Sequence, residues 1–143
     1  MFLPITLTFA AAAALLNFWL AMRISRMRRS ENVLYGDGGN SALTKRMRAQ
    51  ANYVEYTPFI LILTALLELA WNSPTWLWIV SLVYIVARIA HPFGMDADHP
   101  AKTRIFGIIV TWLVVLTLSG AALYTVYAGT EEHVVPDTIS ATV

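Results

Sequence analysis

The sequence of 143 residues contains no cysteine. This absence excludes disulfide bonds, thiolate metal ligands and a cysteine nucleophile within the chain. A reaction at sulfur would therefore need a substrate that brings its own thiol. Charge is also scarce, because Asp, Glu, Lys and Arg make up 13% of the residues, against roughly 25% in an average soluble domain. Hydrophobic residues make up 57%, and this balance predicts that lipid surrounds much of the protein.

Lys and Arg are missing from both chain ends and from the short turn around Asn72. Seven of the ten Lys and Arg residues lie between Arg23 and Arg48, and the other three flank a second loop. Positive charge on alternate loops is typical of a membrane protein with those loops in the cytoplasm. Because membrane topology explains the basic stretch, we expect no nucleic acid partner.

The long apolar runs predict four membrane-spanning helices. Each approaches the length of about 20 residues that a bilayer core requires. The first run is followed, not preceded, by its Arg cluster, which favours a membrane anchor over a cleaved signal peptide. The predicted spans cover residues 2–22, 41–71, 74–90 and 103–127, with a loop over 91–100, and the second span could start at either Ser41 or Thr44. They divide the chain into a four-helix domain at 1–128 and a polar tail at 129–143.

An even number of spans places both termini on one side of the membrane, outside, and the basic loops on the other side, in the cytoplasm. Short connections between consecutive helices favour antiparallel neighbours. The expected fold class is therefore an all-α membrane protein, a bundle of four transmembrane helices that run alternately up and down.

A stripe of polar residues marks the first half of the second span. Arg48, Asn52 and Glu55 are spaced by four and three residues, which places them within about 60° of one another on a helix. One interpretation is a structural ion pair between Glu55 and an arginine of a neighbouring helix. The other is a pocket for a small zwitterionic ligand, whose carboxylates would bind Arg and whose ammonium would bind Glu55. Gln50 points about 200° away from Arg48, so it would reach the same pocket only where two subunits meet.

Further polar residues lie at the same membrane face. Arg88 and His91 are three residues apart near the end of the third span, and Arg104 opens the fourth. Each alone has a plain explanation, either positive-inside anchoring or a solvated imidazole. Their convergence with the stripe favours a functional site. The three histidines, His91, His99 and His133, lack the spacing of metal ligands, and we expect no metal.

The string Arg48-Ala-Gln-Ala-Asn52-Tyr-Val-Glu55-Tyr56-Thr-Pro58 resembles the signature of the MAPEG family, the membrane-associated proteins in eicosanoid and glutathione metabolism. Supporting matches are Gly36-Asp-Gly-Gly39 ahead of it, as in bacterial members, Ala87-Arg88-Ile-Ala-His91, and Arg104. The resemblance covers roughly residues 2–127.

This resemblance implies a homotrimer of four-helix subunits that binds glutathione, as co-substrate, between subunits near the cytoplasmic face. Arg104 resembles the arginine near the glutathione sulfur and would be the catalytic residue. Arg26, or in another register Arg23, resembles the arginine at the end of the first span. The remaining residues expected to bind glutathione are Arg48, Gln50, Asn52, Glu55, Tyr56, Arg88 and His91.

Three positions depart from the family's patterns. Met95 stands where some members have Tyr, Ala51 where the prostaglandin E synthases have Arg, and Ile105 where a Ser follows the arginine near the sulfur. These departures argue against a dedicated prostaglandin synthase.

The function implied is a membrane-bound glutathione transferase of the bacterial inner membrane, which conjugates glutathione thiolate to lipophilic electrophiles. Peroxidase activity on lipid hydroperoxides is a second activity that the resemblance implies. A guanidinium beside the sulfur would lower the pKa of the thiol and so raise the thiolate fraction. Two alternatives remain open. One is a small proton-coupled exporter that uses Glu55, since an acid inside a span commonly marks a proton relay. The other is a catalytically silent membrane scaffold.

Overall fold

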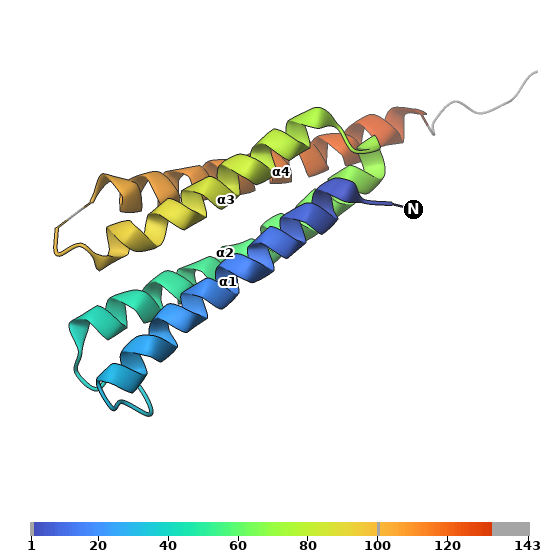
Figure 1. Cartoon of the computed structure of the whole chain (residues 1–143). Coiled ribbons are helices and arrows are strands. Elements are labelled where there is room, and N and C mark those ends of the chain that lie inside the picture. Colours follow the sequence, from blue (N-terminus) through green and yellow to red (C-terminus); the bar gives the residue numbers. More distant parts are fainter. Residues whose placement is uncertain (1, 100, 133–143) are drawn as a thin grey trace, which may run out of the picture.

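The computed structural model describes residues 2–99 and 101–132. Four α-helices follow one another in this part of the chain: α1 (Pro4–Ser30), α2 (Ser41–Trp71), α3 (Thr75–Asp96) and α4 (Lys102–Glu132). Each contains a segment long and apolar enough to cross a membrane. The helices run alternately up and down, so both basic loops lie at one end, and the N-terminus and the end of α4 lie at the other (Figure 1). The predicted all-α bundle of four membrane-spanning helices is confirmed.

Two helical hairpins, α1–α2 and α3–α4, make up the bundle (Figure 1). Helices α2 and α3 each pack against the other three, whereas α1 and α4 do not pack against each other in the described residues. The site residues predicted on α2 and α3 therefore lie on the two helices that organise the bundle. The apolar core between the helices consists of Ile5, Phe9, Ala13, Leu16, Leu20, Tyr53, Ile60, Leu67, Leu77, Tyr84, Val114 and Leu118.

Large apolar side chains are also exposed on the outside of every helix, for example Leu15, Phe59, Leu82 and Leu116. In water such a surface would promote aggregation. In a bilayer it is favourable, because lipid tails are as apolar as these side chains. The outer surface thus suits lipid or other membrane helices.

The first helix is longer than the sequence predicted. We expected its span to end at Met22, but α1 continues through the Arg cluster to Ser30, since Arg and Met are good helix formers. The helix ends in a Schellman motif: Asn32 has a φ of 54°, and the Val33 N–H donates to the Arg28 carbonyl at 2.9 Å. Such a left-handed residue satisfies carbonyl groups that the helix end leaves free.

The predicted loop beginning at His91 was wrong, because α3 continues through Pro92 to Asp96. Proline removes one backbone N–H and usually ends or kinks a helix. Here the additional turn gains contacts that offset this cost. The Phe93 ring packs against Trp19 of α1 with a centroid distance of 5.7 Å, and Asp96 forms an ion pair with Arg23.

The fourth helix also runs beyond its predicted span. It reaches Glu132, past the proposed domain boundary at residue 128. Residues 133–143 of the predicted tail, which include His133, lie outside the described residues.

Ion pairs join three helices at the basic end. Asp96 of α3 pairs with Arg23 of α1 and lies 3.9 Å from Nε of Arg46 on α2. Arg46 also donates to the Arg23 carbonyl at 3.2 Å. Nearby, Lys45 pairs with Asp98, and its hydrogen bond and charge hold the pKa of that carboxyl below its usual value. The end of α3 is thereby fixed against α1 and α2.

The loop before α2 is ordered by its own polar groups. Asp37 accepts hydrogen bonds from the Thr44 hydroxyl at 2.7 Å and the Gly39 N–H at 3.0 Å, and these bonds, that of Thr44 foremost, lower its pKa. The Asn40 side chain accepts from two N–H groups in the first turn of α2, at 3.0 and 3.1 Å. This side-chain cap sets the start of α2.

The opposite end of the bundle contains a buried carboxylate that the sequence analysis did not single out. Glu68 of α2 is 1% exposed and accepts the backbone N–H groups of Ile5 and Thr6 at 2.9 and 2.7 Å. It also accepts the Ser73 hydroxyl at 2.8 Å. The first N–H groups of a helix have no partner within it, and α1 has no side-chain cap of its own. Glu68 of α2 therefore caps α1. Its negative charge also interacts favourably with the positive end of the α1 dipole.

We expect Glu68→Gln to destabilise the protein by about 1–3 kcal/mol, because an amide has one acceptor oxygen and turns its NH₂ group toward backbone donors. The thermal unfolding midpoint in detergent measures this effect. Glu31→Gln, which removes an exposed carboxylate, is the matched control and should leave the midpoint unchanged. Equal midpoints for the two variants would show that Glu68 does not hold α1.

Candidate functional site

A polar cavity of about 220 Å³ opens at the basic end of the bundle. It is formed by the first half of α2, the end of α3 and the start of α4. Four residues predicted for the site thus meet at one place. The lining residues are Arg48, Asn52, His91, Met95, Arg104 and Ile108.

Arg88 lies behind this cavity rather than on its wall. Its side chain is 1% exposed and donates to Asn52 Oδ1 at 2.9 Å and to Thr111 Oγ1 at 3.4 Å. The guanidinium also lies 5.5 Å from the ring centroid of Tyr53, a favourable cation–π distance. Because Arg88 occupies the Asn52 oxygen, the amide NH₂ of Asn52 stays available to a ligand.

His91 is held firmly although it lines the cavity. It is 2% exposed, and its Nδ1 lies 3.2 Å from the Arg104 carbonyl. A carbonyl oxygen can only accept, so this contact places the imidazole hydrogen on Nδ1 and leaves Nε2 as an acceptor. Helix α4 can approach this closely because residue 107 is glycine: a Cβ there would lie 2.6 Å from the His91 Cβ.

Three charged side chains of the predicted site are exposed. Arg48, Glu55 and Arg104 form no ion pair and no side-chain hydrogen bond within the described residues. Arg48 and Arg104 both line the cavity, whereas Glu55 lies outside it. The cavity is therefore flanked by two unneutralised positive charges. The ion pair between Glu55 and a neighbouring arginine, one of the two interpretations of the stripe, is absent from the described residues.

Gln50 lies on a different side of α2, as its helical position predicts. Its Nε2 donates to Asn17 Oδ1 of α1 at 3.3 Å. It lines a separate groove of about 360 Å³ between α1 and α2, together with Ile24, Arg28, Met47, Ala51 and Val54. One chain therefore presents Arg48 and Gln50 in different hollows.

The two remaining predicted residues also lie away from the cavity. The Tyr56 hydroxyl accepts a hydrogen bond from Trp112 Nε1 of α4 at 3.2 Å. Arg26 is exposed on α1 without a partner in the described residues. Its alternative, Arg23, is committed to Asp96.

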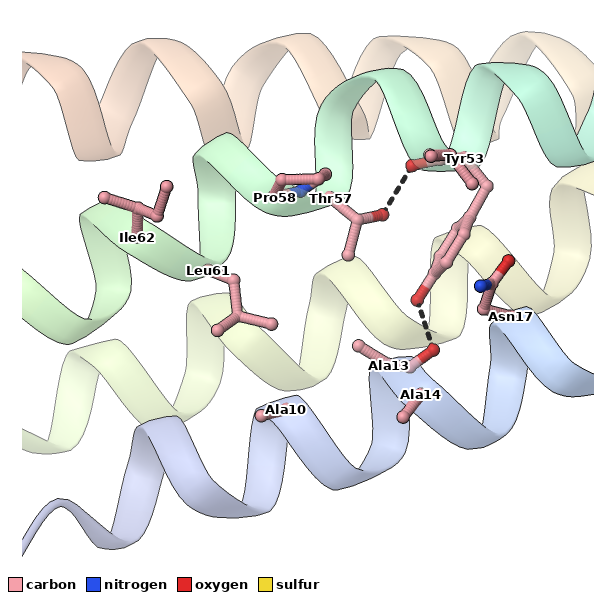
Figure 2. Close-up of a pocket in the computed structure, with 10 residues that line it drawn as sticks. Ala10, Ala13, Ala14, Asn17, Tyr53, Thr57, Pro58, Leu61 and Ile62 are labelled. Atoms are coloured by element: carbon pink, nitrogen blue, oxygen red, sulfur yellow. Dashed lines mark hydrogen bonds between the residues drawn. The ribbon is translucent and has the colours of Figure 1, made fainter.

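A further groove of about 420 Å³ runs between α1 and α2. Figure 2 shows Ala10 and Ala14 on one side, Pro58 and Ile62 on the other, and Asn17 toward one end. Tyr53 crosses to α1, where its hydroxyl donates to the Ala13 carbonyl at 2.8 Å (Figure 2). The groove is almost wholly apolar, so it suits a hydrocarbon ligand or helix rather than a charged group.

Sequence reasoning missed two residues that support the site. Thr111 of α4 and Tyr53 of α2 are both buried and hold the Arg88 side chain. The signal for Thr111 was its place on the inward face of α4, at intervals of four and three from Gly107 and Val114. Within the described residues, no group of three or more His, Asp or Glu could hold a metal ion.

The sequence matches the family model described as "MAPEG family" over residues 6–124. It is also 31% identical over 117 residues to "Inner membrane protein YecN" of Escherichia coli (strain K12), a match that covers 81% of this chain and 88% of that protein. The protein of the same name from E. coli O6:H1 matches equally well. The family model spans most of the chain, including α2 with its polar stripe and the start of α4, and the chain belongs to the MAPEG family.

Proposed function

We propose that this protein is a membrane-bound glutathione transferase, which joins the thiolate of glutathione to lipophilic electrophiles. The observation that carries the proposal is the polar cavity in an otherwise apolar bundle, where Arg48 and Arg104 are both unpaired in the described residues. Glutathione bears two carboxylates that such guanidinium groups recognise. Membership of a family named for glutathione metabolism supports the same ligand.

A second copy of the chain would complete this site. The cavity of about 220 Å³ is smaller than the roughly 300–1,000 Å³ of typical small-molecule sites. Glu55 is exposed on a membrane-spanning helix, where charged residues almost always face protein or a water-filled cavity. We place the Gln50 side of one subunit against the cavity of the next, in the homotrimer that the family resemblance implies.

Within this arrangement the available groups have distinct roles. Arg48 and the NH₂ group of Asn52 bind carboxylate or peptide oxygens, and Glu55 binds the ammonium. Arg26 is the first-helix arginine of the site, since Arg23 is neutralised by Asp96. Arg88 acts indirectly, because its hydrogen bond sets the orientation of Asn52.

Arg104 has the catalytic role in this proposal. A free thiol has a pKa of about 8.5, and only the thiolate is a strong nucleophile. A guanidinium next to sulfur stabilises the thiolate, so the thiol proton leaves to solvent. The sulfur then attacks the electrophilic carbon, and a C–S bond forms as the leaving group departs with its electron pair. With a lipid hydroperoxide, two glutathione molecules would become a disulfide as the peroxide is reduced to an alcohol and water.

A membrane location suits the lipophilic substrates of the proposed reaction. A lipophilic electrophile partitions into the bilayer and would reach the site from the side, along an apolar surface such as the α1–α2 groove (Figure 2). The relative named as an inner membrane protein supports the bacterial inner membrane. The positive charge of the basic loops supports a cavity at the cytoplasmic face.

The exporter alternative has less support. The cavity beside the α2 stripe is lined by Arg48, Asn52 and Arg104, and these groups suit an anionic peptide better than a cationic cargo. Transport in proteoliposomes that is lost in Glu55→Gln would nevertheless favour it. The silent scaffold leaves the unpaired Arg48 and Arg104 without a purpose.

The direct test uses purified protein with glutathione and a chlorinated nitrobenzene. We expect conjugation, measured by product absorbance, and glutathione binding, measured by calorimetry. Arg48→Ala should weaken binding by about ten- to a hundred-fold, the loss typical of a hydrogen bond to a charged group. Absence of both conjugation and binding in the wild type would end the proposal and would favour the silent scaffold, which keeps the fold but binds no glutathione.

Arg104→Ala should raise the apparent pKa of bound glutathione by roughly one to three units, because it removes the positive charge proposed to lie near sulfur. Titration of the ultraviolet absorbance of the thiolate measures this pKa. Lys102→Ala removes a nearby exposed cation that does not line the cavity, and it should leave the pKa unchanged. If bound glutathione has the same thiol pKa in both variants, Arg104 does not stabilise the thiolate.

Glu55→Gln should reduce the affinity for glutathione by about ten- to a hundred-fold, while an analogue that lacks the γ-glutamyl amino group should bind both proteins alike. Calorimetry with the two ligands and the two proteins forms a double-mutant cycle. If the variant loses as much affinity for the analogue as for glutathione, Glu55 does not bind the ammonium.

A further inference from the structure

The end of α1 carries a second charged hollow, separate from the candidate site. It measures about 550 Å³ and lies where α1 passes into the α1–α2 loop. Two guanidinium groups and no carboxylate line it, so it favours an anion. The lining residues are Ser25, Arg28, Arg29, Asn32, Val33 and Leu34.

The two arginines of this hollow differ in their contacts and exposure. Arg28 is partly buried and fixed, since it donates to the Leu34 carbonyl at 3.0 Å and to Met47 Sδ at 3.6 Å. Arg29 is exposed and has no partner within the described residues. The hollow therefore combines one guanidinium held by hydrogen bonds with a second one whose donors are available to a ligand.

An apolar stripe on α1 leads to this hollow. Leu15, Phe18, Met22, Ser25 and Arg29 follow one another at alternating steps of three and four residues, which places them on one face of the helix. Leu15 is 70% and Phe18 64% exposed. The eleven steps from Phe18 to Arg29 rise roughly 16 Å along the helix, so this face passes from hydrocarbon-like to basic along the bilayer normal.

We propose that this face binds an anionic phospholipid, with the headgroup phosphate at Arg28 and Arg29 and the acyl chains along Leu15 and Phe18. The order of apolar and charged groups along α1 matches the order within such a lipid. Arg and Lys near a membrane surface attract anionic lipids by about 1 kcal/mol each. A free anion would use the hollow but not the stripe.

Charge complementarity favours lipid over a second copy of the chain as the occupant. Two of the aspartates at this end of the bundle, Asp96 and Asp98, are neutralised by Arg23 and Lys45, and they offer little free negative charge for Arg29 of another subunit. Asp37 keeps its charge, but its oxygens accept hydrogen bonds from the Thr44 hydroxyl and the Gly39 N–H of its own loop region. Glu31 is exposed, and the experiment below includes it for that reason.

Native mass spectrometry of the full-length, delipidated protein in detergent tests the proposal. The probes are phosphatidylglycerol and phosphatidylethanolamine with identical acyl chains, supplied in equal amounts. We expect the anionic lipid to be retained preferentially. Arg29→Gln should weaken this retention about five-fold, the factor that corresponds to about 1 kcal/mol, and Arg29→Lys should keep most of it.

Lys102→Gln is the matched control, because it removes one exposed positive charge at the same end of the bundle but outside the hollow. It should retain the lipid as the wild type does. Phe18→Asn should reduce the retention of both lipids by the same factor, since it changes only the stripe. Circular dichroism of each variant confirms that the bundle has folded.

Three results would overturn the proposal. If Arg29→Gln and Lys102→Gln reduce the retention of the anionic lipid equally, the lipid responds to diffuse surface charge and not to a site. Displacement of the lipid by inorganic phosphate at the same concentration would show a site for any anion. Loss of subunit association in both Arg29→Gln and Glu31→Gln, with lipid retention unchanged, would assign this face to a second copy of the chain.

Discussion

A polar group inside a bilayer has to find its partner within protein, because hydrocarbon offers none. This constraint separates the polar residues of the four helices into two sets. Glu68 and Arg88 are buried and bonded to other helices, and they hold the bundle together. Arg48, Glu55 and Arg104 are exposed without partners in the described residues. The first set explains how the chain folds, and the second carries the argument for a ligand and a neighbouring subunit.

Helix α2 serves both purposes because its sides differ. One side brings Arg48 and Asn52 to α3 and α4, where the cavity forms. Another brings Gln50 to Asn17 of α1, beside the apolar groove. A single bundle thus presents one part of the proposed binding site on each side of the same helix. Cyclic assembly would bring these parts together at every subunit interface, which is how a heterologous contact closes into a ring.

Hydropathy and charge were sufficient to predict the number of helices, and to predict that both basic loops lie at the same end of the bundle. The helix ends were less predictable. Pro92 indicated a loop, and the contacts that keep α3 helical come from Trp19 and Arg23, far away in sequence. The same limit applies to the site. Periodicity grouped Arg48 with Asn52, but only packing shows that Arg88 lies behind Asn52 and that Glu55 lies outside the cavity.

The carboxylates that hold the two ends of α1 come from later parts of the chain. Glu68 follows its partners by 62 and 63 residues, and Asp96 follows Arg23 by 73. Synthesis proceeds from the N-terminus, so α1 is made before either carboxylate. The contacts that fix both ends of α1 can therefore form only after the third helix has been made.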